Sequence, residues 1–232
     1  MFSPLTPVET EALLLSLKVA FWAVLLSLPF GVALAWVLSR LYFPGKSLLD
    51  GLLHLPLVLP PVVIGYLLLV SLGRNGVIGK ILYEHLGVSI AFTWKGAVAA
   101  SALMAFPLLV RAVRLSIDAV DTRLEMAARV HGAGPWRVFF TITLPLSMPG
   151  LVAGMVLAFA RSLGEFGATI VFVSNIPGQT QTLPLALYTM TQVPGGEGAA
   201  MRLCFLAIVM ALMALIGAAR LEKSFARHFG RY

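Results

Sequence analysis

The sequence of 232 residues is poor in charge and in cysteine. Only 12% of its residues are Asp, Glu, Lys or Arg, about half the share of an ordinary soluble domain, whereas 59% are hydrophobic. A soluble domain could not cover so much apolar surface with polar side chains, so lipid is the expected solvent. The single cysteine, Cys204, excludes an internal disulfide and offers no cluster for a metal ion.

The chain also lacks a phosphate-binding loop. Such a loop needs glycine, four residues, and then Gly-Lys followed by Ser or Thr. The nearest candidate, GRNGVIGK from Gly73, has a different spacing and is followed by Ile81. We therefore expect no ATP site, no enzyme activity and no bound cofactor in this chain.

A basic amino-terminal start is missing as well. The first eleven residues hold Glu9 and Glu11 but no Lys or Arg, whereas a secretory signal begins with positive charge. The apolar run that follows is also too long for a signal peptide. We expect it to be a retained first membrane helix.

Five apolar runs are long enough to cross about 30 Å of hydrocarbon, which takes about 20 helical residues. They predict an all-α polytopic membrane protein with a single domain. The second run contains several prolines, which kink membrane helices, so it is either a bent packing helix or a helix that lines a path. The expected helices cover residues 13–38, 52–72, 92–110, 146–173 and 203–219.

The positions of Lys and Arg predict the direction of the chain. The segments after the first, third and fifth runs hold eleven of these residues, and the opposite loops hold four. Because cytoplasmic loops carry the positive excess, we expect the amino terminus outside and the carboxyl terminus in the cytoplasm. The outer loops, residues 73–91 and 174–202, are long enough for short surface helices, which suggests an external partner.

One stretch between the apolar runs, TRLEMAARVHGAGPWRVFF from Thr122, mixes charges, glycines and aromatics. Thr122 and Glu125 have the spacing of a capping box, so we expect a helix to begin here. Gly132 and Gly134 end that helix. Pro135 is well suited to the first position of a second one.

These two helices, residues 121–143, are too short to span a membrane and predict a helix-turn-helix on the cytoplasmic face. A flat interfacial helix and a solvated loop are the alternatives. The glycine turn disfavours a flat helix, and three large aromatic residues disfavour a loop free in water. Docking to a cytoplasmic partner explains both features.

This stretch resembles the EAA motif of ABC importer permeases: two alanines, a glycine four residues after the second, and a later I-x-L-P. In that family the motif forms coupling helices in a cleft of the ATP-hydrolysing subunit. The family usually has glutamate where this chain has Met126, and Glu125 lies one residue earlier. The resemblance implies that the ATPase-coupling residues are Glu125, Ala127, Ala128, Gly132, Ala133, Gly134, Trp136, Phe139, Leu144 and Pro145.

Three longer blocks resemble the molybdate permeases within that family. They are FPGKSLLDGLLHLPLVLPPVVIGYLLL from Phe43, GAGPWRVFFTITLPL from Gly132 and ARSLGEFGATIVFVSNIPGQTQTLPLALYT from Ala160. The last block separates them from sulfate permeases, and together the blocks extend over nearly the whole chain. The resemblance implies a type I ABC importer permease fold in the bacterial plasma (inner) membrane and the membrane subunit of an ATP-driven molybdate importer.

The resemblance also implies partners. These are a dimer of a molybdate ABC ATPase subunit (ModC-type), an external or periplasmic molybdate-binding protein (ModA-type), a second copy of this chain, and membrane lipid. Five helices are few for a sealed path, which also favours a homodimer. The net charge of +7 follows from the cytoplasmic loops, and no nucleic-acid partner is expected.

Two charged residues interrupt the fourth apolar run, in the outer half of the membrane. Arg161 and Glu165 are functional candidates, because an ion inside a membrane is costly; the alternative is an i,i+4 structural pair. We expect both roles, with Glu165 limiting how tightly Arg161 holds a passing oxyanion. Gly164 allows a helix break, and Pro60 and Pro61 complete the expected substrate path.

Other functions are compatible with these residues. The same machine could carry tungstate or sulfate, since nothing in the chain encodes the radius of the anion. A proton-coupled secondary transporter would use Arg161 and Glu165 and would need no ATPase. A membrane scaffold would transport nothing.

Overall fold

The computed structural model consists of helices, with no strand in the described part of the chain. It describes residues 6–229, with side chains for residues 6–217 and for Arg220. Lys223, Arg227 and Arg231, which contribute to the predicted cytoplasmic charge, therefore lie outside the described side chains. The four longest helices are α1 (Pro7–Arg40), α5 (Trp94–Asp118), α9 (Met148–Leu163) and α12 (Glu197–Phe229).

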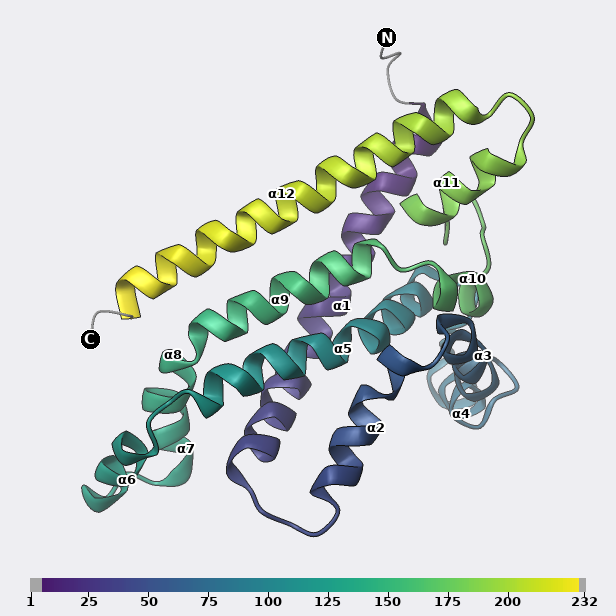
Figure 1. The fold of residues 1–232 in the computed structure, drawn as a ribbon. Helices are drawn as coiled ribbons and strands as arrows, with labels where there is room; N and C mark the ends of the chain where they lie inside the picture. Colours follow the sequence, from purple (N-terminus) through teal and green to yellow (C-terminus); the bar gives the residue numbers. More distant parts are fainter. Residues whose placement is uncertain (1–5, 230–232) are drawn as a thin grey trace.

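These long helices form the body of the protein. α9 lies between α5 and α12, and α1 packs against both α5 and α9 (Figure 1). Glycine allows a close approach of α9 to α5, because a Cβ at Gly150 would lie 2.9 Å from the carbonyl oxygen of Ala112 and one at Gly154 would lie 3.1 Å from that of Leu109. Small residues at helix contacts are typical of membrane bundles, where backbones pack closely.

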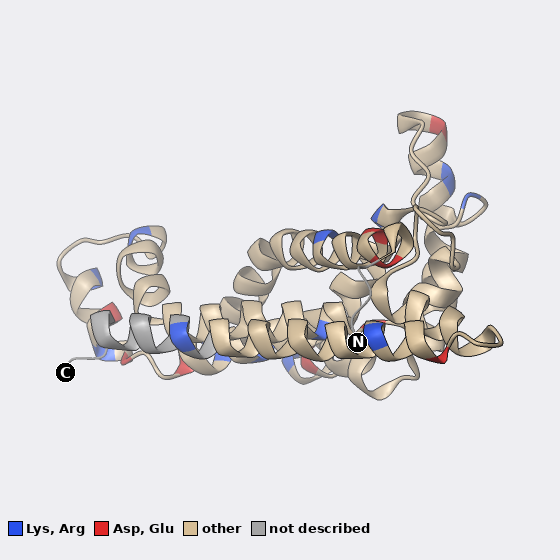
Figure 2. Ribbon diagram, turned by 90° about the horizontal axis from the view of Figure 1, so that it is seen from above, with Lys and Arg blue, Asp and Glu red and all other residues tan. Residues whose placement is uncertain are grey.

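The apolar lengths agree with a membrane protein. Among the described residues, α1, α5 and the first part of α12 are each long and apolar enough to cross a membrane. Two bent helix pairs raise the number of crossings to as many as five if each pair counts as one span: Lys46–Val58 with Pro61–Leu72, and Pro135–Leu146 with Met148–Leu163. The predicted all-α membrane fold is confirmed, and most charges lie toward the ends of the helices (Figure 2).

The second apolar run differs from the single helix expected over residues 52–72. It forms α2 (Lys46–Val58) and α3 (Pro61–Leu72), which are bent by 111°. The break follows from two consecutive prolines, since a residue before proline avoids the helical region and proline has no N–H to donate. Leu59 and Pro60 accordingly have extended ψ angles of 144° and 133°.

The fourth run, expected over residues 146–173, is also broken. α9 ends at Leu163, and α10 (Gly167–Val173) begins three residues after Gly164. α10 packs directly on α3, because a Cβ at Gly65 would lie 2.5 Å from the carbonyl oxygen of Ala168. The two broken runs therefore meet beside their breaks.

The predicted helix-turn-helix is present as α6 (Thr122–Val130) and α7 (Pro135–Val138). α7 continues into η1, a π-helical turn over Phe139–Thr143, and then into α8 (Leu144–Leu146). The predicted capping box is wrong: Asp121 caps α6 by accepting a hydrogen bond from the Arg123 amide at 2.8 Å. The Glu125 carboxylate is engaged elsewhere.

The opposite end of the bundle carries two short helices in the loops where they were expected. They are α4 (Val77–Leu86) and α11 (Leu183–Gln192). α1 is fastened at this end by an ion pair between Glu9 and Arg202 of α12, 2.9 Å long. The Ser16 hydroxyl also accepts a hydrogen bond of 2.6 Å from the first amide of α11.

Candidate translocation path and coupling surface

The charged pair on α9 is formed. Nη1 of Arg161 lies 2.6 Å from Oε2 of Glu165, whose side chain is 1% exposed. The other carboxylate oxygen, Oε1, accepts a hydrogen bond of 2.8 Å from the Ala168 amide. One buried carboxylate therefore neutralises a cation on α9 and satisfies a free amide at the start of α10.

The two charges are buried to different degrees. The Arg161 side chain is 27% exposed, whereas Glu165 is almost completely enclosed. A guanidinium has five N–H donors in a planar fork, so the accessible part of Arg161 can meet an oxyanion while Nη1 holds the carboxylate. The predicted ion pair is therefore present, and its role beside a substrate path stays a prediction.

The structure brings the other predicted path residues close to this break. A Cβ at Gly167 would lie 2.7 Å from the ring of Pro61, so the start of α3 touches the start of α10. Pro60 and Gly164 are both exposed at their respective breaks. Sequence reasoning missed Ser162, whose buried hydroxyl has no hydrogen-bond partner among the described residues.

The helix-turn-helix of α6 and α7, the candidate coupling element, leaves large apolar side chains exposed. Met126, Val130 and Trp136 are 55%, 86% and 75% exposed, and each is large. The arginines at positions 123, 129 and 137 of the same two helices are also exposed. Large apolar residues that remain exposed in a cluster are typical of a protein–protein interface.

Gly132 forms the turn between the two coupling helices. Its φ is +83°, a conformation that side-chain-bearing residues rarely adopt, and a Cβ there would meet nothing within 4 Å. Gly134 has an ordinary φ of −68° and is the N-cap of α7, with Pro135 in the first turn as predicted. The requirement for glycine is therefore conformational and applies to Gly132.

The remaining predicted coupling residues differ in exposure. Glu125 is 6% exposed, so its carboxylate does not face a partner from outside. Phe139 points into the bundle, where its ring lies 6.1 Å from the ring of Trp36 on α1. Three of the predicted coupling residues are exposed, namely Ala127, Gly132 and Gly134. Four are half-buried, namely Ala128, Ala133, Leu144 and Pro145.

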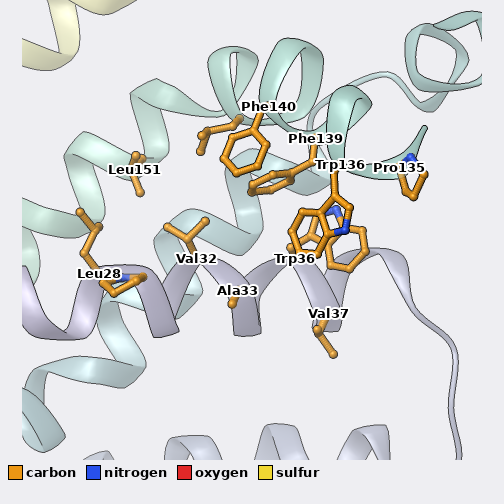
Figure 3. A pocket seen from close by; sticks show the side chains of 12 residues that line it. Leu28, Val32, Ala33, Trp36, Val37, Pro135, Trp136, Phe139, Phe140 and Leu151 are labelled. Atoms are coloured by element: carbon orange, nitrogen blue, oxygen red, sulfur yellow. The ribbon is translucent and has the colours of Figure 1, made fainter. Parts of the chain in front are cut away.

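An apolar cavity of about 670 Å³ lies between the coupling element and α1. Trp36, Trp136 and Phe139 are among its lining residues (Figure 3). Trp136 also stacks on Phe140, with ring centroids 6.3 Å apart. The sequence argument against a solvated loop used three aromatic residues. Of these, Phe139 lies against the bundle, whereas Trp136 and Phe140 are largely exposed.

Sequence reasoning missed the partners of the buried acid on α6. Glu125 pairs with Arg40 at 2.9 Å and accepts a hydrogen bond of 2.8 Å from the Thr143 hydroxyl. Arg40 contributed to the sequence argument only as a positive charge. One signal in the sequence could have indicated this contact. Glu125 lies one residue before the usual position of the motif's glutamate, so its side chain leaves α6 in a different direction from a side chain at that position.

Comparisons with known proteins give a consistent picture. The family profile described as "Binding-protein-dependent transport system inner membrane component" matches residues 27–226. The "Molybdenum transport system permease protein ModB" of Escherichia coli (strain K12) is 64% identical over 212 residues, covering 91% of this chain and 93% of that protein. The protein of the same name from Haemophilus influenzae is 59% identical over 223 residues, covering 96% and 97%.

A solved structure supports the same fold. A bacterial alginate ABC transporter, in complex with an alginate pentasaccharide-bound periplasmic protein, superimposes with a TM-score of 0.75 at 18% identity. The match covers 97% of this chain and 81% of that one. The predicted type I ABC importer permease fold and the resemblance to that family are confirmed.

The burial of the α9 pair predicts an asymmetric response to mutation. Arg161→Gln should lower the free energy of unfolding by about 3–5 kcal/mol, because it leaves a buried carboxylate without its cation. Glu165→Gln should cost less, since Arg161 is 27% exposed and a glutamine oxygen still accepts from Ala168. The measurement is unfolding in detergent of both variants and of the double variant.

The double variant Arg161→Gln/Glu165→Gln should recover much of the stability lost by Arg161→Gln alone. Additive losses would contradict the coupling between these two side chains. If Arg161 also meets the transported anion, the double variant should remain stable and assembled but slow in uptake. Full recovery of uptake would show that the pair is only structural.

Proposed function

Because this chain belongs to the family of binding-protein-dependent transport system inner membrane components, we propose that it is the permease of an ATP-driven molybdate importer. The observation that carries the substrate is the 64% identity, over 91% of the chain, to a molybdenum transport system permease. Two copies would enclose the path, and the energy would come from a separate ATPase, since this sequence contains no phosphate-binding loop.

The ATPase would dock on the exposed surface of α6 and α7. Met126, Val130 and Trp136 offer apolar contact there, and neighbouring arginines favour a cleft with an acidic rim. Ala127 and Ala128 supply small side chains that would let the ATPase approach α6 closely. The tight turn at Gly132 sets the angle between the two docking helices.

The binding protein would dock at the other end of the bundle, which we propose faces outward together with the amino terminus. The segment 176–198, which includes α11, forms part of that end, and Gln179 and Gln192 are exposed there. Released molybdate would then pass the breaks beside Pro60 and Gly164. Arg161 would attract the anion weakly, because Glu165 already neutralises part of its charge.

The function itself is tested by reconstitution. The chain is placed in proteoliposomes with its ATPase, and the external binding protein and labelled molybdate are added. Uptake should require ATP on the ATPase side and should continue without a proton gradient. Uptake that stops when the proton gradient collapses and ignores ATP would identify a secondary transporter instead.

Competition in the same assay tests the anion. Unlabelled tungstate and sulfate are compared with molybdate at equal concentration. Strong competition by sulfate, or import of sulfate in place of molybdate, would contradict the proposed substrate. Absence of any oxyanion uptake in an assembled complex would indicate a scaffold.

The proposed orientation predicts a crosslinking pattern. Cysteine at Gln179 or Gln192 should crosslink to the substrate-loaded binding protein, and cysteine at Val130 should crosslink to the ATPase. Val130 lies at the opposite end of the bundle and is 86% exposed, so it is a matched control. The reverse pattern would invert the topology. The native Cys204 is replaced by alanine throughout.

The left-handed turn predicts a conformational effect at Gly132. Gly132→Val should strain the turn by about 1–2 kcal/mol, because the side chain has space but not the backbone conformation. ATPase co-purification and ATP-driven uptake should both fall while membrane insertion continues. Gly132→Asn is the control, since asparagine tolerates positive φ, and it should keep more of both activities. Normal uptake by Gly132→Val would remove the coupling role.

A further inference from the structure

The cytoplasmic end of α1, in the proposed orientation, carries a guanidinium that is bonded on every nitrogen. The Arg40 side chain is 14% exposed. Its Nε donates to both carboxylate oxygens of Glu125 at 3.1 Å, and its Nη2 donates to Oε1 at 2.9 Å. Nη1 donates to the Ser39 hydroxyl at 3.2 Å. Such a planar fork matches a carboxylate in a way that lysine cannot.

Arg40 also closes the end of α5. Nη2 donates to the carbonyl oxygens of Ile117 at 3.0 Å and Val120 at 3.3 Å. The last carbonyls of a helix have no partner within it, and a cation there also interacts favourably with the helix dipole. One side chain from α1 therefore stabilises the end of α5 and holds the acid of α6.

The connection between α5 and α6 is short. Only residues 119–121 separate Asp118, the last residue of α5, from Thr122, the first of α6. Such a link can act as a hinge unless other contacts fix it. Glu125 supplies these contacts, because it binds Arg40 and also accepts from Thr143 of η1 at 2.8 Å. Four segments, α1, α5, α6 and η1, thus meet at one ion pair.

The position of the acid explains why this contact is internal. Successive residues of an α-helix are rotated by about 100° around its axis. Met126, at the usual motif position, is 55% exposed, whereas Glu125 is 6% exposed. Moving the acid back by one residue therefore turns it from the docking surface to the inner face of α6.

We propose that Arg40 is a positioning residue for energy coupling. By locking the link between α5 and α6, the Arg40–Glu125 pair makes α6 move together with α1 and α5. Displacement of α6 by the ATPase then moves the membrane helices instead of bending the link. The inference rests on the proposed function, because it takes the ATPase to push on α6.

The test uses the complete complex in proteoliposomes, with the ATPase and the binding protein. Arg40→Gln and Thr143→Val should retain the ATPase and hydrolyse ATP, but more ATP should be consumed for each molybdate imported. We expect the ratio of ATP hydrolysed to molybdate imported to rise about tenfold for Arg40→Gln, which is within the usual range of coupling between sites. Thr143→Val removes one hydrogen bond and should have a smaller effect.

Arg114→Gln is the matched control. Arg114 pairs with Asp50 at 3.0 Å, and its side chain is 30% exposed. It also lies 3.8 Å from Asp118, the last residue of α5, so it is another arginine–carboxylate pair near the same end of α5, but neither of these partners lies on α6. The ratio of ATP to molybdate should be unchanged in this variant.

A second measurement follows the link itself. Amide hydrogen exchange over residues 119–130 should be faster in Arg40→Gln and Glu125→Gln than in the wild type and in Arg114→Gln. A wild-type ratio together with wild-type exchange in Arg40→Gln would overturn the proposal. The hydrogen-exchange measurement does not depend on the transported anion. A wild-type complex that imports no molybdate would therefore contradict the proposed function but not the positioning role of the Arg40–Glu125 pair.

Arg40→Lys separates positioning from assembly if Arg40→Gln loses the ATPase. Lysine keeps the charge but lacks the fork that reaches the carboxylate and both carbonyls. If Arg40→Lys again binds the ATPase but its ratio of ATP to molybdate stays high, the result supports the positioning role. If assembly and ratio return together to wild-type values, Arg40 is only structural and the proposal is wrong.

Discussion

Backbone groups exposed by a helix break must find partners within the protein when the break lies in a membrane, because lipid offers none. The break between α9 and α10 meets this requirement with Glu165, which accepts from the Ala168 amide and is in turn neutralised by Arg161. The packing of α10 against α3 depends on these contacts of Glu165. α10 can change direction and lie against α3 only if its first turn is satisfied, and the glycines at positions 65 and 167 then permit backbone contact.

The same arrangement recurs at the coupling end. Glu125 is also a buried carboxylate that pairs with an arginine and accepts a further hydrogen bond. In both places the acid joins segments that the chain alone connects loosely. A buried ion pair is weak evidence for stability, since desolvation offsets attraction, but it fixes geometry because each partner has few alternatives. This favours a role in positioning for both ion pairs.

The sequence predicts the elements better than their directions. Apolar length predicts the long helices, and Pro60, Pro61 and Gly164 predict where two runs break. The 111° bend between α2 and α3 depends on contacts between α3 and α10, which are far apart in sequence. No periodicity contains that information.

The candidate site shows the same division. Arg161 and Glu165 are four residues apart on one helix, so their contact follows from spacing alone. Arg40 and Glu125 are 85 positions apart, and only the packing of α1 against α5 brings them together. The predicted capping box at α6 was wrong because this distant partner engages the acid that the local pattern assigned to the helix start.

The ion pair at the other end of α1 bears on how the protein is made. Glu9 is 3% exposed, and its partner Arg202 follows 193 residues later. While the chain is being synthesised, the acid is made long before its cation exists. The rim around Glu9 is therefore completed only when the last helix arrives, and a chain truncated before α12 retains an uncompensated carboxylate there.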